Sequence, residues 1–270
     1  MTTTCPVCST GQLLAGADEQ YWRCSHCSTE VARCLTPRPA EEYDLIEWYG
    51  HRWEFDLVAQ AIPDGSRVLE LGCGEGYFCK ALLTKSVTYQ GVDFNEEAIL
   101  SAQAKIHKAG TTFLSRLEDA IAPSDTLCAF HVIEHIAQPQ TVLRELIHKH
   151  QISKMYISVP SPIRATVRAA VREHWDNPPH HLYRFSEHGL REMMGRLGFR
   201  RTMTAFEPLR CEEVSAIAQA RLPSWLPRRQ ACARTLTRWL GRIPASKRPR
   251  LGQAMLMGFE KASSSDQARG

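Results

Sequence analysis

Four cysteines near the N-terminus have the residue type and the spacing of a metal site. They form two Cys-x-x-Cys pairs, Cys5 with Cys8 and Cys24 with Cys27, and fifteen residues separate the pairs. Each pair can present two thiolates from one tight turn, and four thiolates surround a tetrahedral zinc ion. A segment this short has too few apolar residues to fold alone, so metal binding would supply its folding free energy. We therefore predict a structural zinc ribbon over residues 1–36.

Two disulfides, or a redox Cys-x-x-Cys pair, are the alternatives for these cysteines. The doubled spacing argues against both, and so does the N-terminal sequence MTTT, which lacks the basic and apolar parts of a secretory signal. We expect a reducing, cytoplasmic location, where disulfides are rare. Cys34 and His26 are spare candidate ligands, and the proline-containing segment 36–40 is expected to be a stiff linker.

A second group of residues has the pattern of a nucleotide-type site. A short apolar run at 67–71 predicts a buried parallel strand, and a glycine-rich turn at 72–76 and a helical pattern from Tyr77 follow it. This order lets the backbone approach a ligand closely, and the first helical N–H groups can receive an anion such as a carboxylate. The next predicted strand, 87–92, ends at Asp93, whose carboxylate can accept both hydroxyls of a ribose.

The glycine turn has the pattern E-x-G-x-G-x-G from Glu70 to Gly76, and Tyr77 stands where the dinucleotide fingerprint needs glycine or alanine. With Asp93 and the strands that follow, it resembles the class I S-adenosylmethionine-dependent methyltransferases. The alternative is a structural turn in another α/β protein. The resemblance implies an α/β fold with a Rossmann-like seven-stranded sheet and helices on both faces. Its later strands are expected at 112–114, 126–130, 155–160, 200–206 and 254–260.

The same resemblance implies a set of residues that bind the cofactor, S-adenosyl-L-methionine. They are the residues of the glycine motif, the acid after the second strand with its neighbour, the segment that contacts adenine, and the start of the loop after the fourth strand. In this sequence these are Glu70, Gly72, Cys73, Gly74, Gly76, Asp93, Phe94, Leu117, Glu118 and His131.

Histidines are the candidates for acceptor chemistry, because a hydroxyl nucleophile benefits from a general base that titrates near neutral pH. The stretch 131–136 is similar to a segment of the subgroup that acts on small molecules and glycans, and the loop after strand five covers the acceptor there. The candidate catalytic residues are therefore His131, His135, His180 and His181. Alternatively, His135 bonds a backbone carbonyl. A metal at the two adjacent histidines is another alternative, but no third ligand stands at helical spacing.

The rest of the chain is expected to complete one methyltransferase domain at 41–262. Aromatic residues at 43–53 either close over the cofactor or pack in the core, and Ser186 is expected to cap a helix. Residues 200–250 hold twelve basic and three acidic side chains, so a basic helical insertion is expected at about 208–250. It is read as a lid whose arginine stems cover apolar surface, or as a peripheral contact with anionic lipid. The tail 263–270 is expected to fray.

Composition limits the classes of function. With 43% hydrophobic and 23% charged residues the chain is globular, and no apolar run is long enough to predict a spanning helix. The favoured function is methylation of a small-molecule, sugar or lipid-linked acceptor. An rRNA or tRNA methyltransferase, with the ribbon and basic segment holding phosphates, is the alternative, although the first forty residues are not basic. A non-catalytic zinc-ribbon adaptor is the third reading. The sequence gives no signal for oligomeric state.

Overall fold

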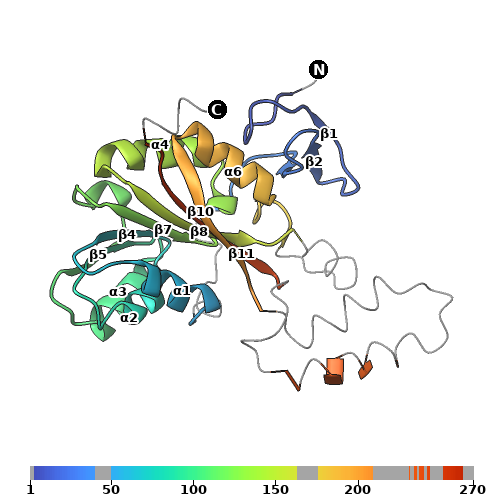
Figure 1. Ribbon diagram of the computed structural model, residues 1–270. Helices are drawn as coiled ribbons and strands as arrows, with labels where there is room; N and C mark the ends of the chain where they lie inside the picture. Colours follow the sequence, from blue (N-terminus) through green and yellow to red (C-terminus); the bar gives the residue numbers. More distant parts are fainter. Residues whose placement is uncertain are drawn as a thin grey trace.

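A central β-sheet with helices on either side makes up most of the molecule (Figure 1). The computed structural model describes residues 3–39, 50–162, 176–208 and 252–263, together with several residues between 231 and 243. Among the described residues, no helix has both the length and the apolar content needed to cross a membrane.

The sheet has seven strands in the order β10-β11-β8-β7-β4-β5-β6. Neighbours from β8 to β6 are parallel, whereas β11 is antiparallel to both β8 and β10. The strands are β4 (Arg67–Leu71), β5 (Thr88–Val92), β6 (Thr111–Leu114), β7 (Thr126–Phe130), β8 (Lys154–Pro160), β10 (Phe199–Phe206) and β11 (Ala254–Lys261). The predicted sheet is confirmed, because each apolar run that predicts a strand forms a strand in the structure. All five residues of β7 are buried, as expected for a central parallel strand.

Helices cover both faces of this sheet, which confirms that part of the expected fold. One face carries α1 (Trp53–Ala61), α2 (Tyr77–Ala81) and α3 (Glu96–Lys105), and the other carries α4 (Pro139–His150) and α6 (Glu187–Arg196) (Figure 1). Each face has its own apolar core, with Phe55, Phe78 and Ile99 on the first and Leu143, Leu190 and Met193 on the second. Two 3₁₀ turns complete the domain, η3 (Leu117–Asp119) and η4 (Ile133–His135).

Two local expectations about helices have different outcomes. Ser186 caps α6 as predicted, since its Oγ accepts a hydrogen bond from the Gly189 N–H at 2.8 Å. The helical pattern predicted at 77–83 forms only a short helix, α2, which ends at Ala81. With only five residues, it has a small dipole, and the loop amides rather than the helix must supply any anion site there.

The N-terminal segment forms a second, smaller sheet. Its strands β1 (Leu13–Ala15), β2 (Tyr21–Cys24) and β3 (Glu30–Ala32) form an antiparallel meander. A fourth strand, β9 (Tyr183–Arg184), pairs with β3 and comes from the chain between β8 and α6. The sequence did not predict this pairing, which joins the cysteine-containing segment to the larger domain through a shared sheet and a shared core.

Several sequence-based predictions fall on residues outside the described part of the chain. These are residues 43–49 of the aromatic segment, most of the basic insertion at 208–250, and the tail beyond 263. Of the aromatic segment, Trp53 is described and begins α1. Helical residues occur at several positions between 231 and 239.

Candidate functional site

The parallel strands bring the predicted cofactor residues to one edge of the sheet. Their register places Leu71 opposite Val92 on one side and Ala129 on the other. Because the strands run in the same direction, the loops that follow them all leave from the same edge. In open α/β sheets, ligands bind in the crevice at the carboxyl ends of the strands.

The glycine turn after β4 is held by its backbone. The N–H groups of Gly72 and Cys73 both donate to the carbonyl of Val92, at 2.8 and 3.1 Å. Gly72 has a φ of 75°, and a Cβ there would lie 2.3 Å from Cγ2 of Val132. The turn therefore packs directly against the segment after β7, and only glycine fits at this position.

Asp93 locks the second loop to the glycine turn. Its Oδ2 accepts from the Gly74 N–H at 2.8 Å, and its Oδ1 accepts from the Asn95 N–H at 2.9 Å. The residue is 6% exposed, and burial raises the pKa of its carboxyl although the two backbone bonds lower it. A carboxylate has lone pairs beyond those two bonds. A glycine-rich turn beside a fixed carboxylate fits a nucleoside.

The remaining predicted cofactor residues differ in exposure. Glu70 is 2% exposed and accepts a hydrogen bond from the Tyr89 hydroxyl. Burial raises the pKa of Glu70 to about 8, so this carboxyl is mainly protonated at neutral pH, and burial also raises the pKa of the Cys73 thiol. Phe94 is 53% exposed beside Asp93. Leu117 is half-buried and Glu118 is exposed, both in η3 after β6.

His131 lies between two carboxylates at the end of β7. Its Nε2 is 3.5 Å from Oε1 of Glu54, and its Nδ1 is 3.5 Å from Oε1 of Glu134. Burial by itself lowers the pKa of His131, but the two carboxylates outweigh it and the pKa is raised. Burial likewise raises the pKa of Glu134, yet His131 and its neighbours bring it down to about 2. These contacts favour a positively charged His131.

Glu54 is the member of this group that sequence reasoning missed. It belongs to α1, is 0% exposed, and its Oε1 also accepts from the Ser158 hydroxyl at 3.0 Å. The available signal was a carboxylate on the apolar face of an amphipathic helix, next to Phe55 and before Val58. A charge at such a position is rare unless it is paired.

The other three candidate histidines meet in one cluster. The ring centroids of His135, His180 and His181 are 4.7 to 5.0 Å apart. No third histidine stands at helical spacing from His180 and His181, but the fold brings His135 to them from a distant part of the sequence. Burial, first of all, lowers the pKa of His135 to about 4 and that of His180 to about 3, so both rings are neutral at pH 7.

Each of two rings in the cluster has one nitrogen fixed by a hydrogen bond. Nδ1 of His135 lies 2.7 Å from the carbonyl oxygen of His180, as the alternative of a backbone carbonyl partner predicted. Nδ1 of His181 lies 2.7 Å from Oδ1 of Asp176. Both acceptors select the tautomer that carries its proton on Nδ1 and its lone pair on Nε2.

The N-terminal sheet holds the loop that carries these histidines. The Tyr21 hydroxyl lies 2.7 Å from the carbonyl oxygen of His181 and 3.2 Å from that of Asp176. The guanidinium of Arg184 stacks on the Tyr21 ring at 3.7 Å, and the Ala32 N–H donates to the Leu182 carbonyl at 2.8 Å. The position of the histidine loop therefore depends on the segment that contains the four cysteines.

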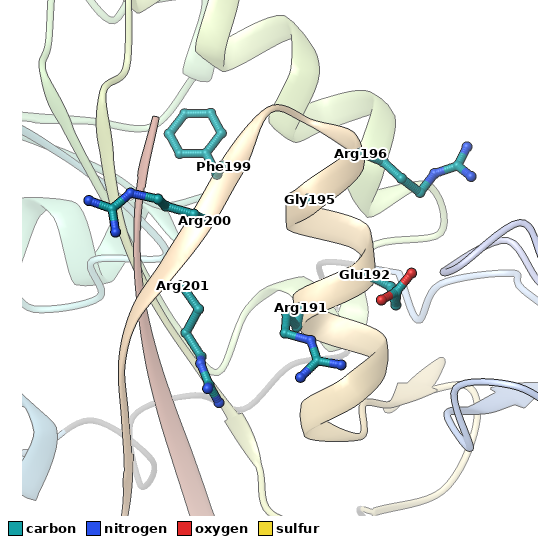
Figure 2. Close-up of a pocket in the computed structure, with 7 residues that line it drawn as sticks. All are labelled: Arg191, Glu192, Gly195, Arg196, Phe199, Arg200 and Arg201. Carbon is teal, nitrogen blue, oxygen red and sulfur yellow. The ribbon is translucent and has the colours of Figure 1, made fainter. Parts of the chain in front are cut away.

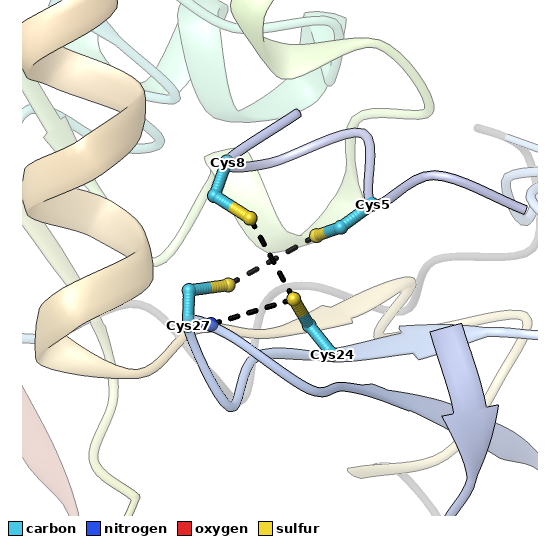
Figure 3. Close-up of side chains that lie close together, drawn as sticks. All are labelled: Cys5, Cys8, Cys24 and Cys27. Atoms are coloured by element: carbon cyan, nitrogen blue, oxygen red, sulfur yellow. Dashed lines mark hydrogen bonds between the residues drawn. The ribbon is translucent and has the colours of Figure 1, made fainter. Parts of the chain in front are cut away.

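The four cysteines point their sulfurs at one point between two turns (Figure 3). Sγ of Cys5 is 3.9 Å from Sγ of Cys27, and Sγ of Cys8 is 3.6 Å from Sγ of Cys24. Tetrahedral zinc with bonds of about 2.3 Å places its sulfurs about 3.8 Å apart. A Cβ at Gly11 would lie 2.4 Å from Sγ of Cys24, so glycine is required beside the cluster. The residues present fit a zinc ion.

Comparison with known protein families identifies the family of this domain. Residues 41–202 match the family model described as a methyltransferase domain. The chain belongs to this methyltransferase family. The expected resemblance to class I methyltransferases is thereby confirmed, and the glycine turn, Asp93 and η4 all lie within the matched residues.

Individual relatives of this methyltransferase domain match only part of the chain. The ubiquinone biosynthesis O-methyltransferase of Paracidovorax citrulli is 30% identical over 39% of this chain and 55% of its own length. The bifunctional O-antigen chain terminator methyltransferase/kinase WbdD of Escherichia coli is 28% identical over 38% of this chain and 16% of its own length. The chain therefore spans about half of the first relative and a small part of the second.

Solved structures share the fold of the methyltransferase domain. One is the complex between the Haloferax volcanii Trm112 methyltransferase activator and a methyltransferase, with a TM-score of 0.52, 17% identity, and coverage of 78% of this chain and 90% of that one. Another is magnesium protoporphyrin IX methyltransferase from Synechocystis PCC 6803, with a TM-score of 0.50, 16% identity, and coverage of 76% of this chain and 78% of that one. At these identities the likeness shows the fold alone.

A basic hollow of about 400 Å³ lies elsewhere on the methyltransferase domain, between α6 and β10 (Figure 2). Its lining includes Arg191, Arg196, Arg200 and Arg201. Arg200 pairs with Glu260 and Arg201 with Glu187, while Arg196 donates to the carbonyl of Cys8 at 3.1 Å. Much of the positive charge of this hollow is thus committed to partners within the protein.

Proposed function

We propose that this protein is an S-adenosylmethionine-dependent methyltransferase that acts on a small-molecule, sugar or lipid-linked acceptor. The observation that carries the proposal is the match of residues 41–202 to the methyltransferase family, with an intact glycine turn bonded to Asp93 inside it. A ubiquinone O-methyltransferase and an O-antigen methyltransferase among the relatives support this acceptor class.

The cofactor half of the site uses mainly backbone. The cofactor supplies an activated methyl group on a sulfonium. The amides of 72–76 would bind its carboxylate, and Asp93 would accept hydrogen bonds from the ribose hydroxyls. Phe94, Leu117 and Glu118 follow β5 and β6 at the same edge of the sheet and would contact the adenine. Glu70 is buried, mainly protonated at neutral pH and bonded to Tyr89, and its place among the cofactor-binding residues stays a prediction.

The acceptor half places neutral imidazoles beside this edge. Burial lowers the pKa of His135 to about 4 and that of His180 to about 3, so both rings are neutral at pH 7 but weak as bases. With no metal bound, they are better suited to accept a hydrogen bond from an acceptor hydroxyl and orient it than to remove its proton. His131 has one ring nitrogen beside Glu54 and the other beside Glu134, so it is suited to hold these two side chains in place rather than to act as the base. Alignment of the acceptor with the methyl group can lower the barrier by several kcal/mol, up to about 7–11 in favourable cases.

Calorimetric titration with S-adenosylhomocysteine tests the cofactor assignment. We expect wild-type protein to bind and Asp93→Ala to lose at least about tenfold in affinity, because a charge-assisted pair of hydrogen bonds is removed. Glu97→Ala is the matched control, since Glu97 is an exposed acid in the first turn of α3. Equal affinity in wild type and Asp93→Ala would remove the cofactor assignment.

We also propose that Cys5, Cys8, Cys24 and Cys27 hold a structural zinc ion. The sulfur distances support it, and so do the N–H groups of His26 and Cys27, which both approach Sγ of Cys24 at 3.4 Å. Cys24→Ser is expected to lower the zinc content by about one equivalent per chain, measured by elemental analysis. Cys34→Ser, at an exposed cysteine outside the cluster, should leave it unchanged. A metal-free, folded protein would contradict the proposal.

The RNA alternative keeps one specific observation in its favour, the hollow with four arginines beside the ribbon. RNA held there by phosphate contacts would lose affinity steeply as salt rises, because counterions are released on binding. We expect weak binding with little salt dependence, since two of the four arginines, Arg200 and Arg201, already pair with carboxylates. A steep fall between about 50 and 200 mM salt, lost in Arg191→Ala, would favour RNA.

A further inference from the structure

The cluster of His135, His180 and His181 has the composition of a second metal site. Each residue offers one ring nitrogen, and these nitrogens all lie within 4.8 Å of one another. Three imidazoles around zinc at about 2.1 Å have nitrogens about 3.4 Å apart, so small side-chain rotations would close the site. We propose that these three histidines bind a divalent transition-metal ion, with zinc the best match to an all-imidazole set.

The bonds around the cluster already orient two of the three rings for a metal. Where histidine binds a metal, its other ring nitrogen usually donates to a carbonyl or a carboxylate, which fixes the ring and its tautomer. His135 has this arrangement through the carbonyl oxygen of His180, and His181 has it through the carboxylate of Asp176. Nε2 of both rings therefore carries the lone pair that a metal needs.

The charge around the cluster also suits a cation. Asp176 is 0% exposed and lies directly behind His181, and Glu134 is 0% exposed next to His135 in the chain. Within the part of the chain that the structure describes, neither oxygen of the Glu134 carboxylate has a hydrogen-bond partner, and His131 lies 3.5 Å from one of them. Arg184, whose Nε lies 3.7 Å from Oδ2 of Asp176, and His131 offset part of this buried negative charge, and a bound metal ion would offset more of it.

The site differs from the other two clusters with metal-ligating side chains. The four cysteines select zinc as a closed structural site, whereas three histidines leave a fourth position for water or an acceptor oxygen. The third cluster, His26, His188 and Glu192, includes an exposed ring on the protein surface and has no buried carboxylate behind it among the described residues. That the fourth position faces a methyl acceptor rests on the proposed function, but metal binding does not.

The test is a calorimetric titration of the full-length protein, with its ribbon metal in place, against zinc chloride in a non-chelating buffer. We expect one binding event that His135→Gln and His180→Gln each weaken by at least about 10–100-fold, because even the loss of a residue that only supports a metal ligand costs that much. His188→Gln is the matched control and should bind like wild type. Wild-type affinity in both cluster variants, or loss only in His188→Gln, would overturn the site.

A second measurement removes the risk that a variant fails to fold. In crystals of the wild-type protein soaked with cobalt(II), the anomalous map should show a peak between the three rings, separate from the peak at the cysteines. Cobalt at the cysteines alone would overturn the proposal. Binding of S-adenosylhomocysteine in the same preparation tests the methyltransferase assignment separately, so failure of one is distinguishable from failure of the other.

Discussion

The two halves of the candidate site are built in different ways. The cofactor half consists of the turn at 72–76 and Asp93, which directly follow two neighbouring strands and are joined by backbone hydrogen bonds. The histidine half takes its residues from η4 and the loop at 176–182, is fixed by Tyr21 from the ribbon, and lies beside His131, whose partner Glu54 comes from α1.

This difference determines how each half responds to change. In the cofactor half the proposed binding groups are mainly backbone amides, so steric fit at glycine positions should matter most. In the histidine half, the side chains are positioned by residues far away in the sequence, such as Tyr21 and Glu54. Removing one of these residues should therefore disturb this half. The following variants separate the two halves.

The largest difference between the two halves is expected when the proposed zinc ion of the ribbon is lost. Cys24→Ser should unfold the ribbon, release Tyr21 from the histidine loop, and lower methyl transfer by about 100-fold, the upper range for loss of a supporting shell. The affinity for S-adenosylhomocysteine should change by less than about threefold, because no ribbon residue bonds the glycine turn among the described contacts. Measuring turnover and affinity on one preparation checks both; an equal loss of the two would mean that the halves are not independent.

Gly72→Ala should damage the other half. The new methyl would lie 2.3 Å from Val132, at a φ of 75° that alanine rarely adopts. We expect a loss of about 2–4 kcal/mol in the free energy of unfolding, with weakened cofactor binding. Gly195→Ala is the matched control, since nothing lies within 4 Å of a Cβ there and alanine favours the helix. Chemical denaturation that gave both variants the same stability would contradict the steric account.

Glu70 gives the cofactor half a pH dependence of stability. Its pKa is raised from 4.5 to about 8 by burial, so the native state keeps a proton that the unfolded chain releases. The stability of wild type therefore falls as pH rises from 4.5 towards 8, and this component is fully present only below 4.5. Glu70→Gln keeps a neutral group and should gain on wild type with rising pH. Denaturation at pH 5, 6.5 and 8 checks this, and a constant difference between the two proteins would disprove it.

The smallest effect is expected from Tyr21→Phe. This change keeps the ring beneath Arg184 and removes only the hydroxyl contacts with the carbonyls of His181 and Asp176. It should cost about 1 kcal/mol in stability. It should also lower kcat with no change in the affinity for S-adenosylhomocysteine. If kcat is unchanged and stability falls, Tyr21 stabilises the fold but does not position the histidine loop for catalysis.

The sequence predicted what depends on local pattern. Alternating elements, apolar runs such as 126–130 and the turn at 72–76 identified the sheet, and Ser186 identified a helix start, because each signal lies within a few residues. The spacing of the cysteines also predicted their proximity. That they bind zinc stays a prediction.

What the sequence did not predict depends on contacts between distant segments. Pairing of β9 with β3, the approach of His135 to His180, and the burial of Glu54 against His131 join residues between 45 and 154 positions apart. No local periodicity encodes such contacts, because they follow from how the helices and the ribbon pack on the sheet. The boundaries proposed for the ribbon, 1–36, and for the methyltransferase domain, 41–262, stay predictions.

The most direct test of the central claim is transfer of labelled methyl from S-adenosylmethionine into a cell extract that is then separated into small molecules, lipids with glycans, and RNA. We expect label in one of the first two fractions with wild-type protein and a strong reduction with Asp93→Ala. Label that enters RNA alone, or enters no fraction with protein that binds S-adenosylhomocysteine, would contradict it.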